Sequence, residues 1–128
     1  MFEKEVNPEG LDKADLVVCI PSYNEADSIS YPVTQASEGL AAFFPEERSV
    51  IINTDNNSPD GTKEAFLNTP TDRPKIYLST EPGVKGKGNN FRNLFEKVVE
   101  LEAKAVVVVD ADLKSITPRW IKNLGEPL

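Results

Sequence analysis

The sequence predicts an α/β fold, an open and mostly parallel sheet with helices on both faces. Three observations predict it: short apolar runs recur along the chain, the runs are continuous rather than alternating, and helical patterns separate them. Continuous apolar runs are typical of strands that are buried on both faces. The predicted strands are Asp15–Ile20, Ser49–Thr54, Lys75–Ser79 and Ala105–Val109.

The segments between these runs predict helices. In Phe91–Val99 the apolar residues recur at i, i+3, i+4, i+7 and i+8, which is one stripe of a helix. Ile29–Phe43 carries a weaker stripe, and Asp60–Leu67 begins with residues typical of a helix cap. This alternation predicts parallel strands joined by right-handed crossovers. We expect the polar segment Met1–Lys13 to be a loose tail or a short helix.

Length and composition exclude several classes of protein. The chain has 128 residues, which fits one domain. Its net charge of −7 repels phosphate backbones, so we expect no nucleic-acid partner. The longest apolar run, Ala105–Val109, is far too short for a membrane span. The single cysteine, Cys19, excludes an internal disulfide and favours a cytoplasmic location, and the lack of histidine excludes His-based triads.

Polar residues follow every predicted strand. Ligands of open α/β sheets bind outside the carboxyl ends of the strands. If the four strands lie in the order third, second, first, fourth, the loops that follow them line one edge. These loops are Pro21–Glu25, Asp55–Asp60, Glu81–Gly88 and Asp110–Asp112.

The sharpest of these elements is Asp110-Ala-Asp112, which follows four valines. Two carboxylates at i and i+2 can face one point once the chain leaves a strand. Oxygen ligands of this kind suit Mg²⁺ or Mn²⁺, which usually bridge to substrate phosphates. The alternative is that Asp110 only ends a strand and Asp112 is solvated. The position after a buried strand favours Asp110 and Asp112 as metal ligands.

The loop Gly83–Gly88 opens the third predicted helix. Glycines permit close backbone approach, a helix N-terminus favours anions, and Lys85 and Lys87 add positive charge. The loop is therefore a candidate site for a phosphate group. The alternative is a flexible solvated loop.

The first two loops carry groups suited to a nucleoside. Asp55 and Asn56 can hydrogen-bond a base or ribose edge; the alternative is an Asx-type turn that leads into the Asp60 cap. Tyr23 can lie against a base, and Glu25 can accept a hydrogen bond from a base or ribose. The alternative for both is a structured turn.

Taken together, the four loops resemble the nucleotide-binding half of GT-A fold glycosyltransferases of the family-2 type. Within that superfamily the chain is most similar to the glucosyl- and mannosyl-3-phosphoglycerate synthases, because of the Gly-Lys-Gly loop and the segment Pro118–Leu128. The matching stretches are Pro21–Glu25, Asp55–Thr62, Gly86–Gly88 and Asp110–Asp112.

The resemblance implies a Rossmann-like domain that binds a nucleotide-diphosphate sugar together with Mg²⁺ or Mn²⁺. The implied donor contacts are Pro21, Tyr23 and Glu25 at the base and ribose, Asp55 and Asn56 at the base, and Lys87 at the base or diphosphate. Many relatives have an acidic residue in place of Asn56, so the identity of the base stays open. Asp112 would bind the metal, and Asp110 would meet the ribose or the metal.

Members of that family continue beyond the Asp-x-Asp motif with an acceptor-binding half, which often adds a histidine ligand. Here only Leu113–Leu128 follow. We therefore expect residues 1–128 to be a single donor-binding domain, the N-terminal part of a longer transferase domain. The expected partner is a C-terminal half or a second copy of the chain, and we expect no sugar transfer by the 128 residues alone.

Two alternatives to a glycosyltransferase remain open. A nucleotidyltransferase also uses an α/β sheet, a glycine- and lysine-bearing loop and metal-binding aspartates. Its glycine-rich loop should directly follow the first strand, where this chain has Pro21–Glu25. The other alternative is a non-catalytic nucleotide-binding or assembly module derived from a transferase. The sequence leaves the sugar, the base, the acceptor and the stereochemical outcome open.

Overall fold

The computed structural model describes residues 5–55, 58, 60–80 and 87–109, with the backbone alone for residues 87–91. In this part of the chain the strands form one sheet in the order β1-β4-β3-β2-β5. The strands are β1 (Glu5–Val6), β2 (Leu16–Ser22), β3 (Ser49–Asp55), β4 (Lys75–Ser79) and β5 (Ala105–Val108).

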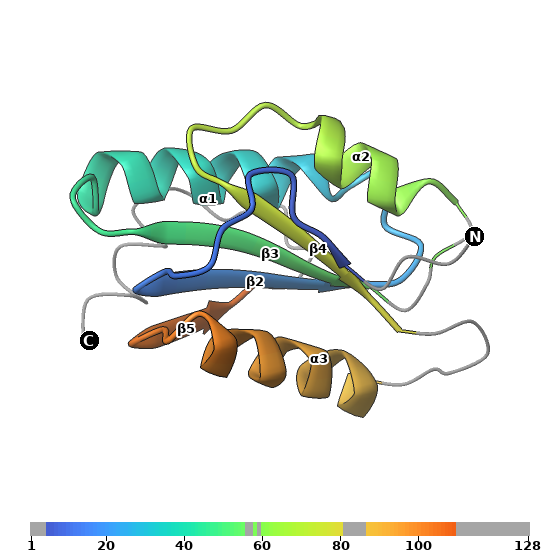
Figure 1. The fold of residues 1–128 in the computed structure, drawn as a ribbon. Helices are drawn as coiled ribbons and strands as arrows, with labels where there is room; N and C mark the ends of the chain where they lie inside the picture. The colour runs from blue at the N-terminus through green and yellow to red at the C-terminus, as the bar shows by residue number, and fades with distance from the viewer. Residues whose placement is uncertain (1–4, 56–57, 59, 81–86, 110–128) are drawn as a thin grey trace.

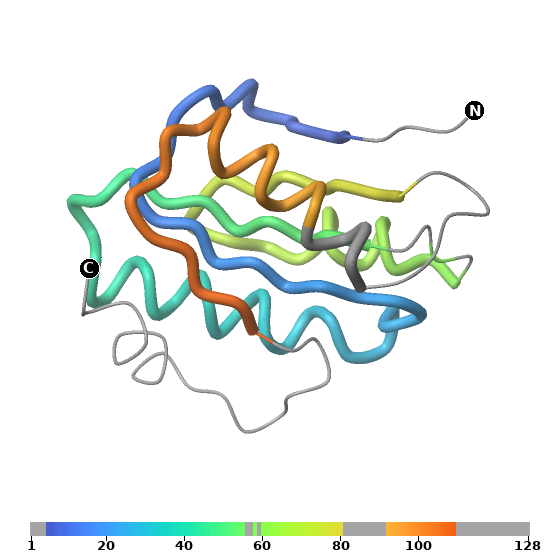
Figure 2. Tube along the Cα trace, turned by 90° about the horizontal axis from the view of Figure 1, so that it is seen from below, coloured from blue at the N-terminus to red at the C-terminus, as the bar shows by residue number. Residues whose placement is uncertain are grey.

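The four predicted strands are confirmed, and so is their order. β4, β3, β2 and β5 are parallel and adjacent in that sequence, which is the order third, second, first, fourth. Figure 2 shows them side by side. β2 runs two residues further than predicted, because its pairing with β3 continues until Ser22 lies opposite Asp55. The carboxyl ends of both strands therefore lie level at one edge.

The expectation for Met1–Lys13 is wrong at Glu5–Val6. These residues form β1, which pairs antiparallel with β4: Glu5 lies opposite Leu78 and Val6 opposite Tyr77. The outer edge of β4 would otherwise leave its N–H and C=O groups unpaired, and a short antiparallel strand satisfies them. A two-residue strand is too short to give a periodic signal in the sequence.

Helices cover both faces of the sheet, as predicted. They are α1 (Ser30–Phe43), α2 (Thr62–Asn68) and α3 (Lys87–Glu100). Figure 1 shows α1 and α2 above the sheet and α3 below it. Alternate residues of β2 enter two buried clusters: Val18 and Ile20 pack with Leu40 and Phe66, and Val17 and Cys19 pack with Leu94 and Leu101. No helix among the described residues combines the length and apolarity that a membrane span requires.

Candidate functional site

The candidate site lies at the edge of the sheet where the parallel strands end. Register places Ser22 opposite Asp55, and Asp55 opposite Ser79, so β2, β3 and β4 end together. This edge lies at the right of Figure 1, where β2, β3 and β4 end. The loops that follow β2 and β3 are therefore neighbours in space although they are far apart in sequence.

Asp55 is the centre of this edge. Its side chain is fully buried (0% exposed), and each carboxylate oxygen accepts two hydrogen bonds. Oδ1 accepts from the Ser22 hydroxyl at 2.8 Å and the Ser58 hydroxyl at 2.6 Å. Oδ2 accepts from the Ser58 backbone N–H at 2.9 Å and the Tyr77 hydroxyl at 2.8 Å. These donors fill the usual accepting capacity of a carboxylate and tie three strands to one loop.

Tyr77 is buried on β4, and its hydroxyl group stays protonated. Burial, followed by the nearby Asp55 carboxylate, raises the pKa of Tyr77 well above its usual value. The Nζ of Lys63 lies 5.8 Å from the centre of the Tyr77 ring. The phenol therefore keeps its proton at neutral pH and donates a hydrogen bond to Asp55.

Asn53 lies two residues before Asp55 on the same face of β3 and is fully buried. Its Nδ2 donates to the carbonyl of Ile20 at 2.8 Å and to the Ser22 hydroxyl at 2.9 Å. Ser22 thus accepts from Asn53 while it donates to Asp55. The end of β2 is fixed by two polar side chains of β3.

The loop after β2 is fastened to the loop after β3 by side chains. Three successive backbone N–H groups, those of residues 24–26, donate to three alternate residues of the second loop and the start of α2. We call these acceptors, Ser58, Asp60 and Thr62, the side-chain clip. The pairs are Asn24 N–H to Ser58 Oγ at 2.8 Å, Glu25 N–H to Thr62 Oγ1 at 3.0 Å, and Ala26 N–H to Asp60 Oδ2 at 3.2 Å.

Asp60 also orders the start of α2. Its Oδ1 accepts from the Thr62 backbone N–H at 3.1 Å and from the Thr62 hydroxyl at 2.5 Å. Burial acts to raise the pKa of Asp60, but hydrogen bonds from the Thr62 hydroxyl and the N–H groups of Ala26 and Thr62 outweigh it and lower the pKa. The N-cap of α2 is Gly61 rather than the predicted Asp60, which lies one residue earlier and bonds the N–H of Thr62, the first helical residue.

The predicted nucleoside contacts of the first loop lie beside this clip. Pro21 is part of β2 and lies opposite Thr54. Tyr23 is 41% exposed. Glu25 is partly buried, and its Oε2 accepts from the Ser28 hydroxyl at 2.8 Å. The structure thus brings Pro21, Tyr23 and Glu25 to the same edge as Asp55.

Comparison with known proteins decides the family. Residues 17–128 match the family model described as glycosyl transferase family 2. The chain belongs to glycosyl transferase family 2. The predicted resemblance to family-2 glycosyltransferases is thereby confirmed, and the match favours a glycosyltransferase over the nucleotidyltransferase alternative. No curated protein sequence matches the chain significantly.

Solved structures share the fold of this family-2 chain. A mycobacterial protein superposes with a TM-score of 0.64 at 20% identity, over 89% of this chain and 36% of that one. The M. tuberculosis glucosyl-3-phosphoglycerate synthase gives 0.59 at 19% identity, over 88% and 41%. The mannosyl-3-phosphoglycerate synthase of Rubrobacter xylanophilus gives 0.60 at 18% identity, over 89% and 37%. The family-2 chain therefore matches well under half the length of each neighbour.

The structure does not describe the side chains of the remaining predicted site residues of the family-2 chain. Asn56, Asp110 and Asp112 lie outside the described residues. Lys87 begins α3, and its side chain is likewise outside the description. Among the side chains that the structure describes, no group of three or more His, Cys, Asp or Glu gathers as a metal site. The hard oxygen donors of Asp110 and Asp112 fit Mg²⁺ or Mn²⁺ by their chemistry, and they stay a prediction.

Sequence reasoning missed several residues that build this edge. Ser22, Asn53 and Tyr77 all bind into the Asp55 network, and Thr62 receives a backbone N–H from the other loop. A signal was available for Asn53, because it interrupts the apolar run of β3 with a polar amide. A polar side chain inside a strand buried on both faces needs partners, and these partners lie at the carboxyl edge of the sheet.

Proposed function

We propose that this family-2 chain is the donor-binding half of a glycosyltransferase that uses a nucleotide-diphosphate sugar and a divalent metal. The observation that carries the proposal is the interlocking of the loops after β2 and β3 by the side-chain clip. It fixes a polar surface with Tyr23 and Glu25 at the carboxyl ends of the strands. In open α/β sheets this is the edge at which ligands bind.

The order of the strands supports the position of the donor. β2 lies between β3 and β5. From β2 the chain adds β3 and β4 on one side and then β5 on the other side, so the strand order reverses between β2 and β5. Such a switch point is where open sheets bind ligands. The N–H of Val109 still donates to the carbonyl of Cys19 at 2.8 Å, so pairing with β2 continues up to the residue before Asp110. We therefore propose Asp110 and Asp112 as the groups that meet the donor across this gap.

The proposed roles follow from charge and exposure. Tyr23 offers a ring to the base, and Glu25 offers an acceptor to the ribose or base. Asn56 is proposed at the base beside Asp55, whose oxygens are already engaged by four donors and whose part is to hold the loop. Lys87 is proposed at the diphosphate, where its charge favours the leaving group. Mg²⁺ or Mn²⁺ at Asp110 and Asp112 would supply further charge stabilisation there.

The acceptor side is proposed to come from outside this donor half, either from further chain or from a second copy. The two named neighbours are synthases of glucosyl- and mannosyl-3-phosphoglycerate. We therefore propose 3-phosphoglycerate as the first acceptor to test. The likeness supports this choice at the level of the fold.

Calorimetry with UDP, GDP and ADP tests the proposal, each with and without Mn²⁺. We expect binding of at least one nucleotide that depends on Mn²⁺ and falls about tenfold or more in Asp112→Asn, because the amide lacks the charge that a hard cation needs. Asp72→Asn is the matched control, since Asp72 is exposed and precedes β4 at the other end of the sheet. A folded protein that binds none of the three nucleotides would contradict the proposal.

A further inference from the structure

Burial alone does not account for the hydrogen bonds that the side-chain clip accepts from the backbone of residues 24–26. The hydrogen bonds at Asn24 and Ala26 lie in exposed surroundings, where water can satisfy a backbone N–H. Three successive N–H groups nevertheless find acceptors on one other loop. The clip therefore selects a conformation of the first loop rather than relieving buried polar groups.

The conformation that it selects is an unusual one. Asn24 has a positive φ of 55°, in the left-handed region that residues other than glycine rarely adopt. A residue stays in such a region when its surroundings determine the backbone around it. Here the N–H of Asn24 itself and those of the next two residues are each held by the clip. The left-handed residue stands between Tyr23 and Glu25 and thereby sets how the two are presented.

Both ends of the clip are anchored to rigid parts of the molecule. Ser58 is held by its N–H and its hydroxyl on Asp55, which is buried in the sheet. Thr62 is fully buried and is the first residue of α2. Beyond the first loop, the carbonyl of Glu25 accepts from the N–H of Ile29 at 2.8 Å, which leads into α1. The turn is thus fixed between the sheet and two helices.

We infer that Ser58, Asp60 and Thr62 are positioning residues for the donor: they fix the turn of residues 23–26 so that Tyr23 and Glu25 face the base and ribose. The inference rests on the proposed function for the ligand that the turn receives. It adds that the backbone N–H groups of this turn are occupied by the protein itself. Recognition by the first loop then falls to the side chains of Tyr23 and Glu25, and the diphosphate is held elsewhere.

The test uses Thr62→Val, which removes the hydroxyl and keeps the shape, and Thr62→Ser, which keeps the hydroxyl. Amide exchange at residues 24–26 is measured by NMR in the ligand-free protein, and the affinity for UDP, GDP and ADP with Mn²⁺ is measured on the same samples. We expect Thr62→Val to speed exchange of the Glu25 amide about tenfold and to weaken nucleotide binding about tenfold, because the Glu25 N–H loses its acceptor and Asp60 loses the hydrogen bond from the Thr62 hydroxyl. Thr62→Ser should restore both.

Two further variants keep the result interpretable. Thr69→Val removes a hydroxyl at the other end of α2, where it donates to the carbonyl of Ala65, and should change neither measurement. Asp60→Ala alters an exposed side chain and should speed exchange at the Ala26 amide, so it serves if Thr62→Val fails to fold.

The outcomes separate this inference from the proposed function. Unchanged exchange at residues 24–26 in folded Thr62→Val and Asp60→Ala overturns the inference. Faster exchange with unchanged nucleotide affinity overturns it as well, since the turn would then be fixed without serving the donor. A wild-type protein that binds no nucleotide contradicts the proposed function and removes the donor from the inference, while the exchange data still decide whether the clip fixes the turn.

Discussion

Two aspartates lie at opposite ends of the sheet and are held in opposite ways. Asp55, at the carboxyl end of β3, is fully buried and accepts from hydroxyl and amide donors that carry no charge. Asp15, just before β2, has 17% of its side chain exposed and pairs with two cations. Arg48 lies 3.3 Å away and Lys104 4.0 Å away, and both side chains are mostly exposed.

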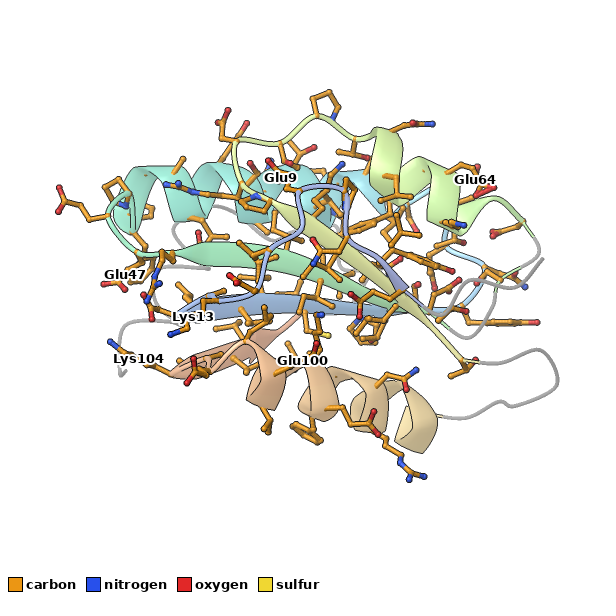
Figure 3. The ribbon with its side chains drawn as sticks, in the orientation of Figure 1. Glu9, Lys13, Glu47, Glu64, Glu100 and Lys104 are labelled. Carbon is orange, nitrogen blue, oxygen red and sulfur yellow. The ribbon has the colours of Figure 1, made fainter. Side chains whose placement is uncertain are left out.

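The difference shows at which end of the sheet polar side chains are most closely held. Figure 3 shows Lys13, Lys104 and Glu47 around the end where β2 begins, and Lys13 pairs with the exposed Glu102 at 3.0 Å. Exposed pairs of this kind contribute little because water and salt screen them. A buried carboxylate is costly unless donors surround it. In this protein the buried carboxylate is that of Asp55, at the carboxyl end of the sheet. Its four donors hold the ends of the strands and the loop after β3.

The largest expected effect is that of Asp55→Asn. The amide offers one acceptor oxygen, and its NH₂ group faces donors, so two donors lose their partner, one of them buried. We expect a loss of about 3 kcal/mol or more in the free energy of unfolding. Urea denaturation measures it as a lower midpoint at an unchanged slope. Asp15→Asn is the matched substitution at the other end, and equal losses in the two variants would break the comparison.

The sheet was largely predictable from the sequence, and the Asp55 network was not. The strands follow from continuous apolar runs, and their parallel direction follows from the helices that connect them. Their order entered the sequence analysis only as a condition, which the structure meets. Register then brings Asp55 to the edge. Its partners lie 33 residues before it at Ser22 and 22 residues after it at Tyr77. A sequence gives the types of such groups but not which of them meet.

The same limit explains the remaining misses. β1 is held by the free edge of β4 and by the ion pair between Glu5 and Lys97 at 3.0 Å, and neither is visible in a two-residue segment. The side-chain clip depends on a left-handed backbone at Asn24, which asparagine tolerates but does not require. Both features arise from tertiary contacts that override weak local preferences.

Tyr77→Phe sharpens the comparison by removing a single donor from Asp55. We expect a loss of about 1–2 kcal/mol at neutral pH, because three donors remain. The pKa of Tyr77 is raised in the folded state from its usual value of 10.0, so its contribution is complete below that value and is lost as the pH rises above it. Urea midpoints measured toward alkaline pH should therefore converge for the wild type and the variant. Parallel curves would contradict a proton-donating role.

The smallest expected effect is that of Arg48→Met, which removes the main cation from Asp15 while keeping an aliphatic stem. The hydrogen bond from Arg48 is the largest cause that lowers the pKa of Asp15, against a smaller opposing effect of burial. A lowered carboxyl pKa contributes stability above the usual aspartate value, and this contribution is lost as the pH falls below it. The urea midpoint of the variant should therefore lie slightly below that of the wild type at neutral pH.

The difference between the two urea midpoints should shrink with acid and with added salt, because both weaken an ion pair whose cation is exposed. The shift should also be smaller than that of Tyr77→Phe, since water can replace the exposed partner of the partly exposed Asp15 carboxylate but cannot reach the buried Asp55. A salt-independent loss as large as that of Tyr77→Phe would mean that the amino-terminal edge is as closely organised as the candidate site.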